Sequence, residues 1–306
     1  MKHCITLAAM LCAAVCAHAA MNKETYVFDV VDGDTLRLDR YYDPAAVRST
    51  EARPVVLFAF GGGFRSGERD NPEYMPFFEF LTSQGIDVVS TDYRTSLAGI
   101  TSINSPAMFA GALGMAITDA VSDYLQAAGF VNANARAWGV DSDRIIACGT
   151  SAGAITALQA EYQLTQMPQA PFRFAGVMSF AGAICSAGEP TWETTPCPML
   201  LFHGDADRQV PYDRILVEGV GLYGSRAVAA TLTEAGVPHV FYTEAGKGHE
   251  VATTPMNEHR YVILGFIRRY VCGTDNSTVN ARQTFPDTPA GYQTEFSLSD
   301  YIRANM

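Results

Sequence analysis

The hydrophobic pattern of the chain begins with two alternating stretches and one continuous stretch. Thr25–Val31 and Leu36–Tyr42 alternate apolar with polar residues on either side of Asp32-Gly33, a pair that favours the tight turn of a β-hairpin. Pro54–Phe60 is continuously apolar, which is typical of a buried strand in a parallel sheet. The sheet is therefore predicted to begin with an antiparallel hairpin and to continue with parallel strands.

Helical and strand-like stretches alternate along the rest of the chain. The predicted helices are Glu73–Gln84, Ala107–Ala128, Ala152–Leu164, Arg226–Ala235 and Glu258–Tyr270. The predicted strands are Ile86–Thr91, Arg144–Cys148, Phe174–Phe180, Pro198–His203 and His239–Thr243. Gly85 and Gly129 are expected to end the first two helices. Because such alternation needs crossover connections, we expect an α/β fold with a mostly parallel central sheet and helices on both faces.

The organisation of the chain indicates one folded domain followed by a tail. No repeat, linker or change in composition interrupts residues 21–272. Hydrophobic residues make up 48% of the chain, which is too many for a disordered protein. Residues 273–306 are polar and weakly patterned, so we expect a C-terminal tail that is either wrapped on the domain or disordered.

The first twenty residues have the pattern of a secretory signal peptide. Lys2 precedes the apolar run Ile5–Val15, and small residues follow it at Ala17 and Ala19. The run is too short to span a bilayer. We therefore expect cleavage near Ala19 or Ala20 and export to the periplasm or the medium, without a stable membrane anchor.

The charge balance narrows the class of partner. The chain has 21 Lys and Arg against 32 Asp and Glu, a formal net charge of −11, and contains no run of basic residues. Binding to nucleic acid needs clustered positive charge that displaces counterions from phosphates. We therefore expect no nucleic-acid partner.

Four of the seven cysteines lie outside the predicted signal peptide: Cys148, Cys185, Cys197 and Cys272. Cys185 and Cys197 share a loop rich in Pro, Gly and Thr, and an exported chain meets an oxidising compartment. These two are predicted to form a disulfide, whereas Cys148 lies in an apolar run and is expected to be buried. The cysteine spacing matches no zinc motif.

The strongest chemical signal is the Gly-Thr-Ser-Ala-Gly sequence of residues 149–153, between a predicted strand and a predicted helix. Glycines on both sides permit a sharp turn that holds Ser151 at its apex in a strained conformation. The amino terminus of the helix places free N–H groups beside a developing negative charge. Ser151 is therefore predicted to be a nucleophile, and a purely structural turn is the alternative.

A serine nucleophile needs a histidine base and an orienting carboxylate, here expected in the order Ser, Asp, His. His249 lies in the glycine-rich loop Ala245–Glu250, which follows the strand His239–Thr243 and would present an exposed imidazole. We therefore predict His249 as the base. Structural roles are expected for the other histidines after the signal peptide: His203, His239 and His259.

Two aspartates compete for the role of the acid. Asp205 and Asp207 follow the apolar strand that ends at His203, and open α/β sheets build their sites at the carboxyl ends of strands. The loop by itself leaves both residues possible. His203, Asp205 and Asp207 could together bind a metal ion, but no second cluster of ligands completes a coordination shell, so no metal is predicted.

A glycine-rich loop after the first buried strand supplies candidate hydrogen-bond donors. Gly61, Gly62 and Gly63 lie between two phenylalanines, and consecutive glycines let backbone N–H groups turn toward a ligand. No Gly-Lys-Ser/Thr follows, which disfavours a phosphate site. The N–H groups of Gly62, Gly63 and Ala152 are predicted to form an oxyanion hole. A merely flexible loop is the alternative.

Together these features resemble the α/β-hydrolase superfamily, within it the carboxylesterase and hormone-sensitive-lipase-like branch. The resemblance extends from Pro54 to about Tyr270. Residues 60–64, Phe-Gly-Gly-Gly-Phe, are similar to the His-Gly-Gly-Gly-Phe oxyanion loop of that branch, and residues 92–94 to its Asp-Tyr-Arg turn. Phe60 replaces a histidine that buttresses the loop in the family, although the backbone donors do not depend on that side chain.

The acid loop and the expected activity also follow from the resemblance. Residues 203–211 match the family's His-Gly-x-x-Asp-x-x-Val-Pro loop, which implies that Asp207 is the acid and leaves Asp205 a loop-shaping role. The expected activity is a serine carboxylesterase that forms an acyl-enzyme and needs no cofactor. A serine peptidase of the same superfamily and a catalytically silent binding protein of this fold are the alternatives.

The short connection Ala181–Cys197 leaves no room for the large helical lid of many lipases. We therefore expect short or compact acyl groups on a small-molecule or carbohydrate ester, such as acetyl or feruloyl esters of polysaccharides. Phe64 and Trp192 are candidate substrate contacts. Trp192 is predicted to form a pocket wall with the Cys185–Cys197 pair, and a tryptophan packed in a rigid loop is the equally open alternative.

Overall fold

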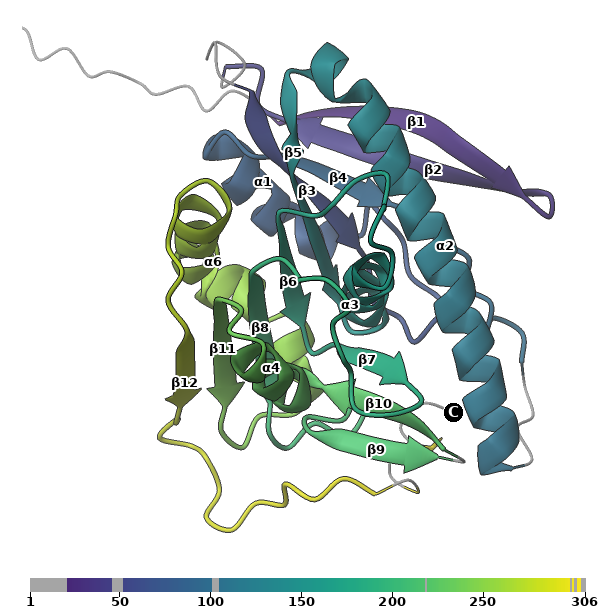
Figure 1. Cartoon of the computed structure of the whole chain (residues 1–306), viewed down its shortest axis with the longest axis vertical. Coiled ribbons are helices and arrows are strands. Elements are labelled where there is room, and N and C mark those ends of the chain that lie inside the picture. The colour runs from purple at the N-terminus through teal and green to yellow at the C-terminus, as the bar shows by residue number, and fades with distance from the viewer. Residues whose placement is uncertain are drawn as a thin grey trace, which may run out of the picture.

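The computed structural model describes residues 21–45, 52–100, 105–217, 219–297, 299 and 302–303. A nine-stranded sheet forms its centre, in the order β1-β2-β4-β3-β5-β6-β8-β11-β12 (Figure 1). The strands are β1 (Asn22–Val31), β2 (Asp34–Tyr42), β3 (Arg53–Ala59), β4 (Asp87–Thr91), β5 (Val140–Thr150), β6 (Gly176–Phe180), β8 (Met199–Gly204), β11 (His239–Glu244) and β12 (Val279–Gln283). The predicted signal peptide, residues 1–20, lies outside the described residues.

The strand directions confirm the predicted mixture of pairings. β1 is antiparallel to β2, and β2 is antiparallel to β4. Every pairing from β4 to β12 is parallel. Because parallel strands all end on one edge, the loops after β3, β5, β8 and β11 gather at the same end of the sheet.

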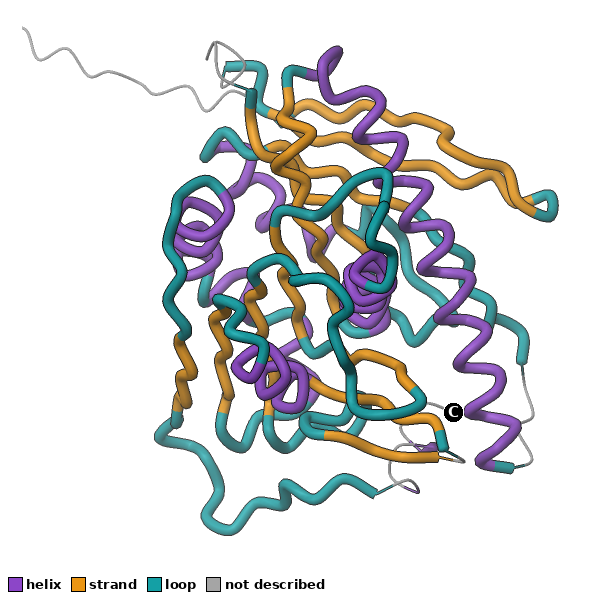
Figure 2. The backbone as a smooth tube through the Cα atoms, viewed as in Figure 1, coloured by secondary structure: helices purple, strands orange, loops and turns teal. Residues whose placement is uncertain are grey.

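Helices cover both faces of the sheet, as the alternating pattern predicted (Figures 1 and 2). The helices are α1 (Met75–Ser83), α2 (Pro106–Trp138), α3 (Ala152–Thr165), α4 (Ser225–Glu234), α5 (Pro255–Glu258) and α6 (Arg260–Phe266). α2, α3 and α4 lie on one face, and α1 packs with α5 and α6 on the other. The last predicted helix, Glu258–Tyr270, is divided at His259, between α5 and α6. A π-helical turn, Ile267–Val271, follows α6.

The helix expected to end at Gly129 instead continues to Trp138. Val131, Ala135 and Trp138 are buried and keep the helical spacing beyond that glycine. Their burial outweighs the cost of about 1 kcal/mol that a glycine imposes inside a helix. The helix is closed by Gly139, whose φ of 66° is the left-handed conformation of a C-terminal cap.

A second, three-stranded sheet was not predicted. Its order is β7 (Ala183–Ser186), β10 (Val220–Gly224) and β9 (Arg214–Val217), all antiparallel. β7 lies in the connection between β6 and β8, which contains no helix, in agreement with the expected lack of a large lid. The predicted tail is also partly ordered, because β12 adds a parallel edge strand to the main sheet.

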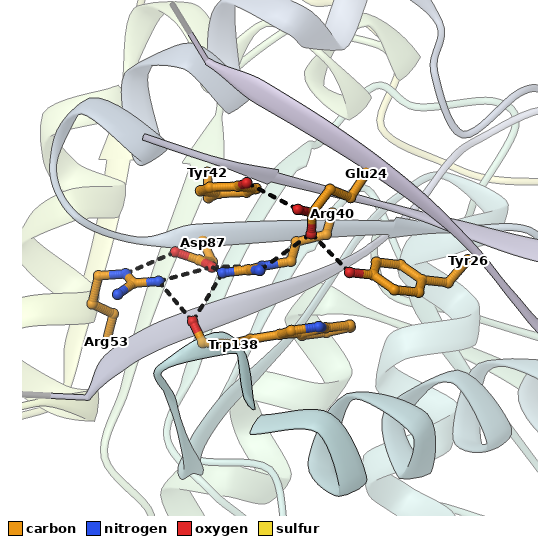
Figure 3. Close-up of polar contacts among 7 residues, drawn as sticks. All are labelled: Glu24, Tyr26, Arg40, Tyr42, Arg53, Asp87 and Trp138. Atoms are coloured by element: carbon orange, nitrogen blue, oxygen red, sulfur yellow. Dashed lines mark hydrogen bonds and ion pairs between the residues drawn. The ribbon is translucent and has the colours of Figure 1, made fainter. Parts of the chain in front are cut away.

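A buried charge cluster joins α2 to the sheet (Figure 3). Asp87, the first residue of β4, accepts hydrogen bonds from Arg53 Nε at 2.9 Å and from Arg40 Nη2 at 2.8 Å. Both arginines also donate to the carbonyl oxygen of Trp138, at 2.9 and 3.1 Å. Because carbonyl groups at a helix carboxyl terminus carry partial negative charge, the two guanidinium groups bind the end of α2 as well as Asp87.

Candidate active site

Ser151 lies at the apex of the sharp turn between β5 and α3, as predicted. Its φ of 53° and ψ of −120° are strained for a residue with a side chain, and its N–H donates to the Phe180 carbonyl at 2.9 Å. A Cβ at Gly149 would lie 2.2 Å from the Gly153 carbonyl oxygen, and one at Gly153 would lie 2.1 Å from that of Ala59. Both glycines are therefore required by the close approach of neighbouring backbone.

Ser151, His249 and Asp207 form one continuous hydrogen-bonded line. His249 Nε2 lies 2.7 Å from Ser151 Oγ, and His249 Nδ1 lies 2.7 Å from Asp207 Oδ2. In this arrangement the Nδ1–H group donates to the carboxylate, which leaves Nε2 able to accept the serine proton. The structure thus brings together the three residues that the sequence analysis selected, and it selects Asp207 over Asp205 as the partner of His249.

The carboxylate of Asp207 is buried but fully hydrogen-bonded. Its Oδ1 atom accepts from the backbone N–H groups of Gln209 at 2.7 Å and Val210 at 3.0 Å. Burial by itself would raise the pKa of Asp207, but the imidazoles of His203 and His249 outweigh that effect and hold its pKa below the usual range. Asp207 is therefore ionised when His249 takes up a proton.

The other histidines support neighbouring loops, in line with their predicted roles. His203 is fully buried and contacts Ser225 Oγ at 2.9 Å and the Val210 carbonyl oxygen at 3.3 Å. His239 Nδ1 lies 2.9 Å from the Val237 carbonyl oxygen. His259 stacks on Phe202 at the junction of α5 and α6. None of these contacts directs an imidazole toward Ser151.

The glycine loop after β3 faces Ser151 with free backbone donors. Gly62 and Gly63 have φ values of 129° and 62°, and a Cβ at Gly62 would lie 2.0 Å from the Ser66 carbonyl oxygen. Within the described residues, the N–H groups of Gly62 and Gly63 donate to no backbone or side-chain acceptor. Ala152 opens α3, so its N–H has no acceptor inside that helix. These are the three donors predicted for the oxyanion hole.

Tyr93 buttresses the glycine loop at the position where Phe60 replaces the family's histidine. The two rings stack at 4.4 Å, and the Tyr93 hydroxyl donates to the Phe60 carbonyl at 2.7 Å. On the other side of the loop, the Gly61 N–H donates to the Tyr74 hydroxyl at 3.3 Å. The sequence analysis noted the Asp-Tyr-Arg turn as a family motif but missed this contact, because it joins two loops that are distant in the chain.

A small cavity beside Ser151 is lined by apolar side chains. Phe64, Leu97, Phe109, Leu113 and Ile155 form its walls, together with the glycine loop and the acid loop. Phe64, predicted as a substrate contact, is thus one of the residues that line this cavity. The cavity lies between Ser151 and the first turns of α2.

Trp192 does not line this cavity, so the predicted pocket wall is wrong. Its ring packs edge-on against Tyr162, with 5.5 Å between ring centroids. Its loop is fastened to the far end of α3, because the Thr194 N–H and hydroxyl both donate to the Thr165 carbonyl oxygen. Since Ser151 precedes the other end of this 14-residue helix, about 20 Å separates the two ends.

The predicted disulfide is also wrong, because Cys185 and Cys197 are both free thiols. The Cys185 N–H donates to Gln159 Oε1 at 2.8 Å, and the Cys197 N–H donates to Glu161 Oε1 at 2.9 Å. Residues two apart on a helix point in different directions, so α3 holds the two cysteines on different sides. Their shared loop composition contained no signal for this separation.

Neither a metal site nor a membrane span emerges from the described residues. Nowhere in these ranges do three or more His, Cys, Asp or Glu side chains gather so that they could hold a metal ion. Nor does any helix within them combine the length and the apolar character needed to cross a bilayer.

Three solved structures of one bacterial esterase, two with a bound ligand and one without, have a fold similar to that of this chain. Esterase Est2 of *Thermogutta terrifontis* with bound propionate superposes with a TM-score of 0.61 at 21% identity, over 83% of this chain and 97% of that one. Its butyrate complex gives 0.60 at 21% identity, over 83% and 96%. Its apo form gives 0.58 at 23% identity, over 80% and 94%. At this level of identity the likeness concerns the fold, which is that of the α/β hydrolases.

Sequence comparison adds a family and one curated relative. Juvenile hormone esterase of *Heliothis virescens* is 29% identical over 114 residues, which are 37% of this chain and 19% of that enzyme. The chain therefore matches about a fifth of the length of this relative. The carboxylesterase family model matches residues 6–190, more than half of the 306 residues. The chain thus belongs to the carboxylesterase family.

Proposed function

We propose that the protein hydrolyses carboxylic esters of short acyl groups through an acyl intermediate on Ser151. The observation that carries this proposal is the continuous line from Ser151 Oγ through His249 to Asp207, with 2.7 Å at each step. Membership of the carboxylesterase family supports the reaction type.

In the first half of the proposed reaction, Ser151 Oγ attacks the ester carbonyl carbon while His249 Nε2 takes the hydroxyl proton. The carbonyl oxygen becomes negative, and the N–H groups of Gly62, Gly63 and Ala152 stabilise it. Asp207 stabilises the positive imidazole and keeps its Nδ1 protonated. Collapse of the tetrahedral intermediate breaks the bond to the alcohol, which leaves with the proton from Nε2.

In the second half, a water molecule replaces the alcohol. His249 Nε2 takes one proton from this water as its oxygen attacks the acyl carbon, and the same three N–H groups bind the new oxyanion. Cleavage of the bond to Ser151 Oγ releases the carboxylic acid, and His249 returns the proton to the serine. The enzyme is thus restored without any cofactor.

The cavity beside Ser151 favours short acyl groups. The cavity is small, and Phe109 and Leu113 of α2 are among the apolar side chains that line it together with Ser151. Est2 of *Thermogutta terrifontis*, which shares the fold, has been solved with bound propionate and butyrate. We therefore propose acetyl to butyryl groups as the preferred acyl parts, with acetyl esters of polysaccharides favoured over feruloyl esters among the carbohydrate substrates.

A graded series of nitrophenyl esters, from acetate to long acyl chains, tests the proposal. We expect turnover that is highest for acetate to butyrate and that falls by a factor of about 10³ or more in Ser151→Ala. Ser83→Ala is the matched control, because that exposed serine bonds only the Phe80 carbonyl and the Gln84 side chain, at the end of α1. Ester turnover that does not depend on Ser151, or none at all, would contradict the proposal and favour the peptidase or binding alternatives.

We also propose that residues 1–20 direct export. The support is the sequence pattern alone: a basic start, an apolar run and small residues before Ala20. Fractionation of cells that express the full chain, with sequencing of the mature amino terminus, tests this proposal. A product that keeps residues 1–20 and stays in the cytoplasm would contradict it.

A further inference from the structure

The C-terminal segment crosses the catalytic end of the sheet. β12 lies beside β11 with Gln283 opposite Glu244, and the next N–H, of Ala245, donates to the Gln283 carbonyl at 2.9 Å. From there the chain runs past the carboxyl ends of β11 and β8 (Figure 1). Ala245 opens the loop that carries His249, so the segment is fastened to that loop at its first residue.

The buried carboxylate of Asp205 joins three parts of the molecule. Its Oδ1 atom accepts from the Gly246 N–H at 2.7 Å, within the histidine loop. Its Oδ2 atom accepts from Arg282 Nη2 at 2.6 Å and from the Tyr292 hydroxyl at 2.8 Å, both in the C-terminal segment. Asp205 is also only two residues from Asp207, so one carboxylate links the acid loop, the histidine loop and the C-terminal segment.

Further contacts press the C-terminal segment against the histidine loop. The Thr288 hydroxyl donates to the Ala245 carbonyl at 3.2 Å, and Lys247 Nζ lies 3.6 Å from Asp287 Oδ2. Gly246 has a φ of 71°, and a Cβ there would lie 2.6 Å from the Thr288 methyl group. The positive φ and this close contact together favour glycine, which restricts the path of the loop three residues before His249.

The acid loop is held by the same segment. Arg208, the residue after Asp207, donates to the Gln293 carbonyl at 3.1 Å and to the Glu295 carbonyl. The Ala206 N–H donates to the Lys247 carbonyl at 3.0 Å, which ties the acid loop directly to the histidine loop. Both loops that supply the proton-transfer groups are therefore fastened to residues 279–296.

We propose that Asp205, Arg282 and Tyr292 are positioning residues that hold His249 between Asp207 and Ser151, with residues 279–296 as a clamp on both loops. The inference rests on the proposed function, because it assigns His249 the role of base. A displacement of about 1 Å in a catalytic group costs on the order of 10²-fold in rate. The three residues act without touching the substrate, by fixing the loop that precedes the imidazole.

Arg282→Gln and Tyr292→Phe test the positioning role, because each removes one hydrogen bond from Asp205 Oδ2 at a half-exposed or exposed position. We expect kcat per titrated active site to fall about 10-fold to 10²-fold with KM little changed. Arg282→Lys, which keeps the charge, should recover part of the loss. Arg226→Gln is the matched control, since this exposed arginine lines the same surface pocket as Arg282 and Asp205 but pairs with Asp213.

A proton NMR signal separates positioning from simple stabilisation. The proton between His249 Nδ1 and Asp207 Oδ2 should resonate far downfield in the wild type and broaden or shift in Arg282→Gln at temperatures where the variant is fully folded. In the double variant Arg282→Gln/Tyr292→Phe, the loss of kcat, expressed as free energy, should be smaller than the sum of the two single losses, because both residues act through Asp205.

Unchanged kcat per titrated site and an unchanged downfield signal in Arg282→Gln and Tyr292→Phe would overturn the proposal, even if their melting temperatures fell. An equal loss in Arg226→Gln would also overturn it, since the effect would then be one of general charge. If the wild type hydrolysed no ester, the proposed function would fail. The clamp could still be measured by the NMR signal and by the rate at which a fluorophosphonate modifies Ser151.

Discussion

Two buried aspartates at opposite ends of the sheet are bound by arginines in different ways. Asp87 begins β4 and is held by Arg40 and Arg53, whose side chains are 7% and 6% exposed. Asp205 follows β8 and is held by Arg282, whose side chain is 51% exposed. The partners of Asp87 belong to core strands, whereas the partner of Asp205 belongs to the C-terminal segment.

This difference separates the end of the sheet that mainly stabilises the fold from the end that carries the candidate active site. The charges at Asp87 are shielded from water, so each depends on the others for compensation. The guanidinium of Arg282 is half exposed to water, so its pairing with Asp205 contributes less to stability, and without it Asp205 still accepts from the Gly246 N–H and the Tyr292 hydroxyl. We therefore expect changes at Asp87 to appear mainly in the free energy of unfolding, and changes at the catalytic end mainly in kcat.

The largest effect should come from Asp207→Asn at the catalytic end. The backbone N–H groups of Gln209 and Val210 keep the amide oxygen at the Oδ1 position, so the amide NH2 faces His249 Nδ1 and donates to it, which holds the imidazole in the wrong tautomer. We expect kcat for nitrophenyl acetate to fall by about 10⁴-fold, while the chemical unfolding curve changes far less. A loss below tenfold would show that another carboxylate serves His249, and Asp205→Asn would then be the variant to compare.

The opposite result is expected at the other end of the sheet, from Asp87→Ala. Removal of this carboxylate leaves two buried guanidinium groups without their anion, which costs about 3–5 kcal/mol of unfolding free energy. Urea unfolding followed by circular dichroism measures this loss. In the surviving folded fraction, kcat per titrated active site should equal that of the wild type, and a fall in that quantity would break the comparison.

A pH-dependent effect is expected from Glu244, at the carboxyl end of β11. Burial raises the pKa of Glu244 to about 7 from 4.5, and the nearby carboxylate of Glu258 adds to the rise. The folded state then binds a proton that the unfolded state has released. Stability contributed by this proton is therefore present below pH 4.5 and is lost as the pH rises to about 7.

Above pH 7 the buried Glu244 carboxylate is ionised, which lowers the free energy of unfolding, and Glu244→Gln should remove this cost. Because one pKa unit corresponds to about 1.4 kcal/mol, we expect the variant to be more stable than the wild type by about 1–3 kcal/mol at pH 8. The two proteins should have nearly equal stability at pH 4.5. Unfolding curves at both pH values measure the difference, and a gain that is the same at both would contradict the raised pKa.

The smallest effect is expected from Glu24→Gln at the rim of the Asp87 cluster. Glu24 accepts from the hydroxyls of Tyr26 at 2.7 Å and Tyr42 at 2.9 Å, and its carboxylate lies 3.4 Å from Arg40 Nη1 (Figure 3). Its side chain is 40% exposed, and in the amide the oxygen can keep one tyrosine bond while the NH2 group donates to the other tyrosine hydroxyl. We expect a loss below about 1 kcal/mol. A loss as large as that of Asp87→Ala would show that water does not screen the rim.

The parts of the site that the sequence could predict depend on short segments. The turn at Ser151 needs only glycines next to the nucleophile, and a Cβ at either one would meet backbone atoms. His249 was identified because few histidines remained and one of them lay in a glycine-rich loop after a strand. These signals lie within a few residues of the groups they identify, so they can be read without the fold.

The predictions that failed depended on the path of the chain. Cys185 and Cys197 share a loop, but α3 binds their backbones through side chains that point in different directions. Trp192 was placed near the nucleophile because its loop follows β6, yet hydrogen bonds to Thr165 carry that loop to the far end of α3. The short strands β7, β9 and β10 have too few residues for a clear hydrophobic period.

By itself, then, the sequence determined the α/β layout and singled out Ser151, His249 and the glycine loop, because periodicity and local sterics act between residues that are close in the chain. The tertiary structure placed Asp207 against His249, as the resemblance to the family implied, and it alone decided that Asp205 binds Arg282, which lies 77 positions away. Such contacts depend on where the sheet brings distant loops together. For that reason the C-terminal segment, which the sequence left as a tail, became part of the catalytic end of the molecule.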